Sequence, residues 1–193
     1  DFQITARGFG QTGKLQSGQN VKAFYTNIDF TYSVSKKIKL TAGNEIKSGN
    51  NGLDSLNTTD HAFDILYGAK HKFNGRIDYF SLPSTTKGTG FIDTYLKTRF
   101  NVMKYASLSA EYHYFMLENN YVYNGSVIDK FLGNEIDLVY KQDFGNDIAL
   151  EAGYSFILGT ESAEIIKGGN KDLWNHWFYF MVTIDPTFFI SKK

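Results

Sequence analysis

The chain contains no cysteine, only two prolines and no excess of charge of either sign. The absence of cysteine excludes a disulfide framework and a thiolate-ligated metal site. Its 20 basic and 20 acidic residues give a formal net charge of zero, so it lacks the basic excess expected of a nucleic-acid binder. The longest purely apolar run, Trp177 to Val182, is far shorter than the roughly 20 residues of a transmembrane helix. Membrane-spanning β-strands are not excluded, because their signal is alternation rather than a long apolar run.

Aromatic side chains are abundant: the 193 residues include 17 Phe, 13 Tyr and 2 Trp. The length corresponds to one domain, and we expect a single β-barrel domain over residues 1–193. The sequence begins with Asp1 instead of Met, which predicts a mature product or a piece of a longer chain.

Apolar and polar residues alternate along most of the chain, which is typical of β-strands with one apolar and one polar face. Over residues 148–158, Leu150 and Tyr154 share one face, whereas Glu151 and Ser155 share the other. The predicted class is therefore all-β. We expect about ten strands, near residues 2–11, 24–34, 37–47, 62–73, 75–82, 92–102, 106–116, 132–142, 148–158 and 173–184.

The connections between these strands are of two kinds that alternate along the chain. The short ones lie at 35–37, 73–75, 103–104 and 143–147. The long, polar, Gly- and Asn-rich ones lie at 48–61, 117–130 and 159–172, with shorter members at 12–20 and 83–89. In an antiparallel up-and-down meander, this order predicts that all long loops gather at one end of the sheet and all tight turns at the other.

Strand length favours a membrane. A strand of about eleven residues, at roughly 3.3 Å per residue and roughly 45° of tilt, rises about 25 Å, which matches the apolar band of a transmembrane barrel. Aromatic residues also cluster near the strand ends, as in an interfacial girdle. The alternative is a soluble all-β sandwich or a lipocalin-like barrel, in which the apolar face would form the core. The many full charges on the opposite face favour a transmembrane antiparallel up-and-down β-barrel.

Five stretches of the chain carry a resemblance to a known family. They are residues 66–80, 131–138, 148–153, 160–169 and 177–189. These stretches resemble the C-terminal portion of the alginate-export family of outer-membrane β-barrel porins. The resemblance implies a larger barrel of about eighteen strands, of which this chain would be the C-terminal half. It also implies a multi-pass location in the outer membrane of a Gram-negative cell, in contact with membrane lipid and lipopolysaccharide.

The function that the resemblance implies is passive diffusion or export of small polar solutes or saccharides through a water-filled channel. We expect no catalysis, no cofactor and no nucleic-acid partner. Two alternatives stay open. The barrel could be a subunit or anchor of a larger envelope complex, with other envelope proteins as partners. It could also be a rim-active outer-membrane hydrolase, for which His61 and His176 with nearby acidic residues are the candidates.

If the polar faces line a lumen, their side chains form the candidate site. The lumen candidates are Lys70, Lys72, Arg76, Asp93, Lys97, Arg99, Glu111, His113, Glu135, Asp137, Lys141 and Glu151. Basic and acidic residues are equally numerous on these faces, whereas an exporter of a polyanion should show a basic excess. This balance speaks against alginate itself as the solute. The charges either pair across strands and stiffen the wall, or form a local constriction lined by Lys70, Lys72, Arg76, Lys97 and Arg99.

Two smaller patterns could bind a metal ion. Glu111 and His113 are two residues apart on one strand face, but they lack a third ligand, which favours charge pairing and no metal site. The acidic residues at 161–164 could bind a divalent ion, or begin a short loop helix. We predict the helix, with Thr160 as its N-cap and Glu164 in its first turn.

Overall fold

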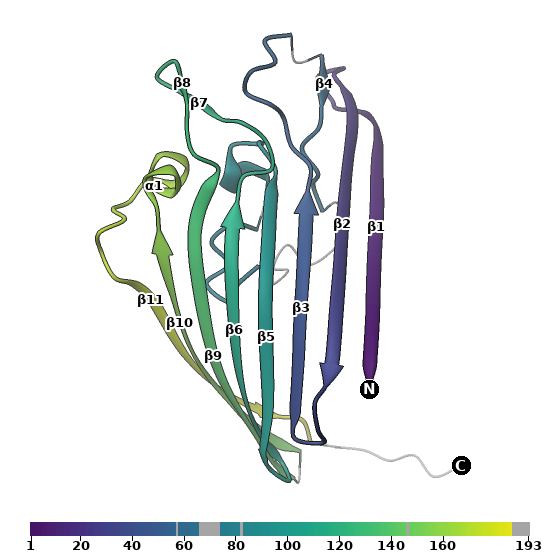
Figure 1. Ribbon diagram of the computed structural model, residues 1–193, viewed down its shortest axis with the longest axis vertical. Coiled ribbons are helices and arrows are strands. Elements are labelled where there is room, and N and C mark those ends of the chain that lie inside the picture. Colours follow the sequence, from purple (N-terminus) through teal and green to yellow (C-terminus); the bar gives the residue numbers. More distant parts are fainter. Residues whose placement is uncertain (57, 66–73, 82, 146, 187–193) are drawn as a thin grey trace.

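The computed structural model describes the chain except for residues 57, 66–73, 82, 146 and 187–193, and one strongly curved antiparallel sheet dominates it (Figure 1). The described residues form eight long strands, each paired with the next along the chain. The long strands are β1 (Phe2–Lys14), β2 (Asn20–Ser33), β3 (Ile38–Lys47), β5 (Phe91–Met103), β6 (Ala106–Met116), β9 (Phe131–Gly145), β10 (Ile148–Gly159) and β11 (Asn175–Ile184). The predicted all-β, antiparallel up-and-down arrangement is confirmed at this level.

Two of the predicted strands are not observed among the described residues. The prediction over 62–73 falls partly on residues outside the described ones, and its described part, 62–65, is not in a strand. The prediction over 75–82 is wrong for residues 75–81, which form an irregular segment. The physical reason is backbone conformation: Gly75 and Asp78 have φ of 74° and 59°, in the left-handed region that interrupts an extended strand.

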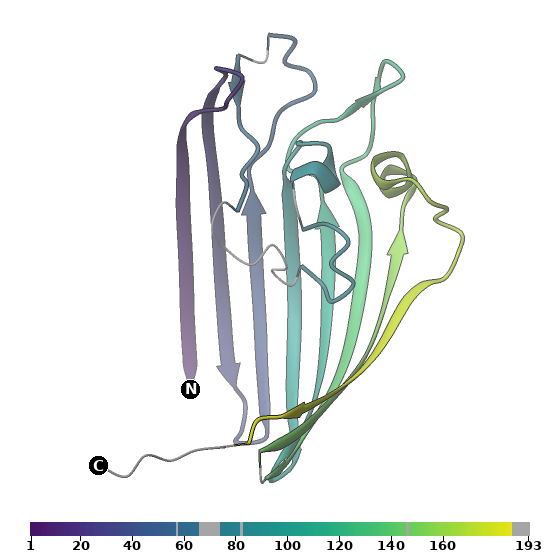
Figure 2. The same cartoon turned by 180° about the vertical axis from the view of Figure 1, so that it is seen from behind.

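Most connections follow the predicted order, but residues 74–75, predicted in a tight turn, belong to the long connection between β3 and β5. Long loops lie at one end of the sheet, called here the loop end, and the tight turns lie at the other, called the turn end (Figure 1). Residues 48–90 make the longest connection, between β3 and β5, and part of it folds back over the concave face of the sheet (Figure 2). We call the described residues 74–81 the inner segment.

Several short elements lie at the loop end. β4 (Thr59–Asp60) pairs parallel with β2, η1 (Pro83–Thr86) is a 3-10 helix, and β7 (Val122–Tyr123) and β8 (Ser126–Val127) form a small hairpin. The helix predicted after Thr160 is confirmed as α1 (Glu161–Lys167), with the Thr160 hydroxyl accepting a hydrogen bond from the Ala163 N–H. Within the described residues, every helix is too short and too polar to cross a membrane.

The two faces of the sheet reverse the usual pattern of burial, because apolar side chains are exposed and charged side chains are buried. Apolar side chains on the convex outer face are exposed: Leu96 is 51% exposed and Leu138 is 42% exposed. On the concave inner face, Glu135 and Asp137 are both 0% exposed. A soluble sandwich would bury the apolar face in its core, and no such core covers the outer face among the described residues.

Apolar residues also pack together on the inner face, close to the loop end. They come from the ends of four wall strands, from α1 and from the inner segment. The cluster consists of Phe80, Phe91, Phe115, Leu117, Leu132, Ile157, Ala163 and Ile166. The Phe80 ring meets those of Phe91 and Phe115 at centroid distances of 5.6 and 5.7 Å. This cluster fastens the inner segment and α1 to the wall.

The sheet does not close on itself. Over the described residues, β1 pairs only with β2 and β11 pairs only with β10, so two strand edges stay open. The described strands therefore do not close into a barrel by themselves. What the structure establishes is a curved, open, antiparallel sheet.

Candidate functional site

Strand register assembles a row of charged side chains across the middle of the inner face. Lys97 on β5 lies opposite Glu111 on β6, and Glu111 in turn lies opposite Asp137 on β9. One step closer to the loop end, His113 lies opposite Glu135. Side chains on one face of a strand recur at every second residue, so the two rows stack on the same inner face.

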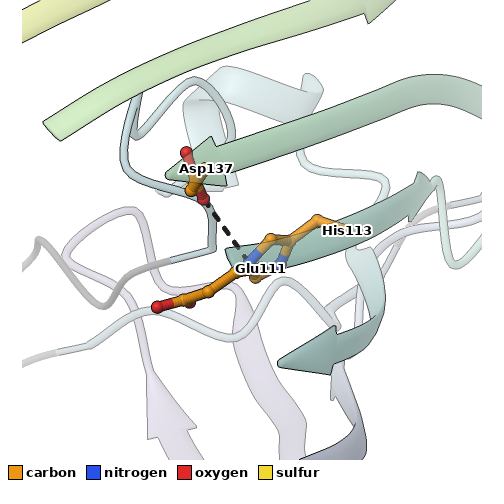
Figure 3. Close-up of side chains that lie close together, drawn as sticks. All are labelled: Glu111, His113 and Asp137. Carbon is orange, nitrogen blue, oxygen red and sulfur yellow. Dashed lines mark ion pairs between the residues drawn. The ribbon is translucent and has the colours of Figure 1, made fainter. Parts of the chain in front are cut away.

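His113 lies at the centre of this group and is 0% exposed. Its Nδ1 is 2.9 and 3.0 Å from the two carboxylate oxygens of Asp93. Its Nε2 lies 3.7 Å from Glu111 Oε2 and 3.7 Å from Asp137 Oδ2. Figure 3 shows the three side chains close together. The imidazole therefore has carboxylates on both sides.

Two cations balance part of this negative charge. The Lys97 ammonium is 3.0 Å from Glu111 Oε2, and the Arg76 guanidinium is 3.4 Å from Glu111 Oε1 and 3.3 Å from Glu151 Oε1. Burial by itself lowers the pKa of Arg76, but Glu111 and the other acidic neighbours outweigh it, so the pKa is raised. Arg76 therefore stays charged while it links the inner segment to the wall. On the far side of Glu151, Lys141 makes a further ion pair of 2.6 Å.

The inner segment docks through its backbone. The Ile77 N–H donates to Glu135 Oε1 at 2.9 Å, and the Arg76 N–H donates to Asp137 Oδ2 at 3.3 Å. Gly75 lies so close to the Glu135 carboxylate that a Cβ at residue 75 would overlap it. Two wall carboxylates thus accept consecutive backbone N–H groups, an arrangement that holds a loop firmly against a sheet.

Asn74 ties the inner segment to a second group of wall residues. Its amide donates to Glu45 at 3.1 Å and to Asp93 at 3.2 Å, and its carbonyl oxygen accepts from the Lys47 ammonium at 2.5 Å. Tyr25 donates to the same Glu45 carboxylate at 2.7 Å. This polar network is buried, so each charge in it is held by hydrogen bonds rather than by water.

The structure brings most of the predicted lumen residues together. One group on the inner face contains Asp93, Glu111, His113, Glu135 and Asp137 together with Arg76 and Lys97. Glu151 and Lys141 extend this group toward the turn end. Arg76 reaches the group from the inner segment and not from a strand, which corrects its predicted placement. His113, Glu135 and Asp137 lie beneath the inner segment instead of facing an open space.

The predicted five-cation constriction is not assembled as expected. Lys70 and Lys72 lie outside the described residues. Arg76 and Lys97 meet at Glu111, but Arg99 is exposed and lines a cavity of about 440 Å³ at the turn end. The dominant arrangement among the described candidates is therefore charge pairing between the wall and the inner segment.

The rim residues considered for hydrolysis do not meet. The His61 Nδ1 lies 2.7 Å from the carbonyl oxygen of Lys22 on β2, whereas the His176 ring is tilted against that of Tyr154 toward the opposite edge of the sheet. The sequence reasoning missed Asn74, which it read as a turn residue, and Tyr179, whose hydroxyl contacts both Arg76 and Glu151. The Asn-Gly pair at 74–75 was the one available signal, because it also suits a loop that bends close to another surface.

No family model and no curated protein sequence matches this chain. The resemblance to alginate-export porins therefore stays a prediction.

Proposed function

We propose that this chain forms part of the wall of an outer-membrane β-barrel channel, through which small polar solutes or saccharides diffuse passively. The observation that carries the proposal is the inverted burial of the sheet. Leu96 and Leu138 stand exposed on the outer face at mid-strand, while charged side chains fill the inner face. Lipid is the solvent that matches such an outer face, and water suits the opposite one.

The aromatic residues of the outer face support the same orientation. Trp174 stacks on Phe156 at 4.8 Å and donates to the Tyr154 hydroxyl at 3.1 Å, near the loop end. Tyr114 stacks on Phe131 at 4.5 Å at the same height. Amphipathic rings of this kind concentrate where a barrel passes through the membrane interface.

The open edges of β1 and β11 require partners in such a setting. Unpaired backbone N–H and C=O groups are too costly to leave in hydrocarbon. We therefore propose that further strands complete the wall, in a barrel of about eighteen strands as the family resemblance implies. A barrel of that size encloses a water-filled lumen, whereas eight strands leave room only for side chains.

The inner segment supplies a constriction in this proposal. It folds over the inner face at mid-height and is fixed there by hydrogen bonds to Glu135, Asp137 and Glu45 of the wall (Figure 2). Arg76 projects from it and meets Glu151 and Tyr179. Solutes would pass on the open side of this segment, close to paired charges that favour small polar molecules over apolar ones.

Single-channel recording in a planar bilayer tests the proposal. The intact protein should give stepwise conductance, with no ATP or other energy source present. Radiolabelled small sugars should also enter liposomes that contain the protein, faster than they enter protein-free liposomes. A protein that inserts and folds but conducts no current and admits no sugar would contradict the channel.

One observation favours the second candidate, a sealed barrel that anchors or belongs to a larger envelope complex. The inner face is closely packed at the loop end by the cluster around Phe80, Phe115 and Leu132, each at most 1% exposed. If that packing extended across the whole lumen, no solute would pass. The conductance measurement separates the two, because the anchor predicts stable insertion without current.

A further inference from the structure

The Nε2 atom of His113 faces two carboxylates without making a hydrogen bond. The ring's Nδ1 lies 2.9 Å from Asp93 Oδ2, so in the neutral ring the proton resides on Nδ1 and is donated to Asp93. The Nε2 atom is then an acceptor, and it is buried without a hydrogen-bond partner in the described structure. A carboxylate behind the far nitrogen of an imidazole is the arrangement found at metal-ligating histidines, where it fixes the tautomer.

The atoms that Nε2 faces are carboxylate oxygens at spacings suited to a metal. Glu111 Oε2 and Asp137 Oδ2 are each 3.7 Å from Nε2, and the three potential ligand atoms all lie within 4.8 Å of one another. In a tetrahedral zinc site with bonds of roughly 2.0–2.2 Å, ligand atoms are about 3.3–3.6 Å apart. Small side-chain movements would bring all three to bonding distance of one ion.

The charge of the group supports a dication. Four carboxylates gather here, from Asp93, Glu111, Glu135 and Asp137, while the cations in contact with them are Arg76 and Lys97. Four carboxyl groups therefore face two cationic lysine and arginine side chains. The buried Asp137 Oδ1 and Glu135 Oε2 have no hydrogen-bond partner in the described residues. A doubly charged ion would add positive charge where carboxyl groups predominate.

We propose that Glu111, His113 and Asp137 bind one divalent transition-metal ion, for which zinc is the best match (Figure 3). One imidazole nitrogen with two carboxylate oxygens is a donor set that zinc accepts, with a water completing four-coordination. Lys97 and Arg76 donate to Glu111, and the Arg76 N–H donates to Asp137, so the ligating carboxylates are themselves held in place. The ion would join β6 to β9 beneath the inner segment. This site does not depend on the proposed channel.

Metal binding by chelator-treated intact protein tests the site. Titration calorimetry with zinc chloride should give one ion per chain. His113→Gln or Asp137→Asn should weaken binding at least tenfold, and Asp93→Asn should weaken it by roughly 10–100-fold through loss of the ring orientation. The control is the double variant His61→Ala/His176→Ala, which removes rim histidines and should bind zinc like the parent.

Either of two titration results would overturn the site. One is no stoichiometric zinc binding by the parent protein, which would mean that a protonated His113 pairs with Glu111 and Asp137 instead. The other is unchanged binding in His113→Gln. Should the substitutions prevent folding, X-ray absorption of the zinc-loaded parent decides the matter. It should show one imidazole nitrogen and oxygen neighbours at roughly 2.0–2.2 Å; a shell without imidazole would reject the site.

Discussion

The ring of Tyr179 on β11 lies against Gly153, its partner in the β10–β11 register, so closely that a Cβ at residue 153 would overlap the ring. Tyr95 covers Gly43 on the β3–β5 pair in the same way. Each glycine lets a tyrosine lie flat across the neighbouring strand, where its hydroxyl reaches polar groups of the inner face. Aromatic rings that cover strand glycines are known to support sheets at these weak positions.

Gly153→Ala should destabilise the protein by about 1–3 kcal/mol, the usual cost of adding a carbon to a filled position. The added methyl would displace the Tyr179 ring and break its contacts with Arg76 and Glu151. The free energy of unfolding in urea, measured in lipid vesicles, checks this. Gly10→Ala on β1 is the matched control, because a Cβ there meets nothing within 4 Å. Equal stabilities of the two variants would show that the ring contact matters little.

Gly75→Ala should release the inner segment from the wall. The residue has φ of 74°, where a Cβ costs about 1–2 kcal/mol, and the added atom would also overlap the Glu135 carboxylate. Gly125→Ala, at φ of 79° with open space around its Cβ, carries the backbone cost alone. The free energy of unfolding in urea should therefore be lower for Gly75→Ala than for Gly125→Ala. Equal free energies for the two variants would mean that the contact with Glu135 does not hold the inner segment on the wall.

Leu138→Arg distinguishes lipid from water at the outer face. At mid-membrane the substitution should cost about 2–4 kcal/mol, whereas an exposed position in water would change by less than about 0.5 kcal/mol. Leu138→Ala serves as the control for lost side-chain volume. Unfolding from vesicles gives both values. A penalty no larger than that of the alanine variant would mean that Leu138 does not touch lipid.

Arg76→Gln should shift the channel toward cations. The substitution removes the charge that balances Glu111 and Glu151 at the proposed constriction, so the local potential becomes more negative. The reversal potential in a potassium chloride gradient measures the shift. Lys36→Gln, in the exposed turn between β2 and β3, loses the same charge far from the inner segment and should leave selectivity unchanged. Identical reversal potentials for both variants would place the permeation path away from Arg76.

The strands of the wall could be predicted because their alternation is strong. The expectation over 106–116 coincides with β6, and that over 92–102 differs from β5 by one residue at each end. The inner segment could not be predicted from its pattern. Ile77, Tyr79 and Phe80 are as apolar as strand residues. They pack against the inner face of the sheet, however, and do not pair with a neighbouring strand. The pattern of apolar residues predicts that they are buried, but it does not indicate the surface against which they pack.

The candidate site was predictable in its residues and not in its geometry. Spacing alone places Glu111 and His113 on one face of a strand, yet the third potential ligand, Asp137, comes from β9. Its arrival opposite Glu111 depends on the β6–β9 register, which shifts by an irregularity between Phe115 and Met116. A loop of fourteen residues separates those strands in the sequence, from 117 to 130. No pattern in a single sequence fixes such a register.

The contact between the outer face and lipid is tested most directly by labelling, for which the absence of native cysteine provides a clean background. A nitroxide attached to Leu138→Cys in liposomes should collide often with oxygen, which concentrates in hydrocarbon, and rarely with a water-soluble nickel chelate. The same label at Lys36→Cys should show the opposite preference. A label at Leu138→Cys that meets the nickel chelate as freely as the Lys36→Cys label would contradict the account.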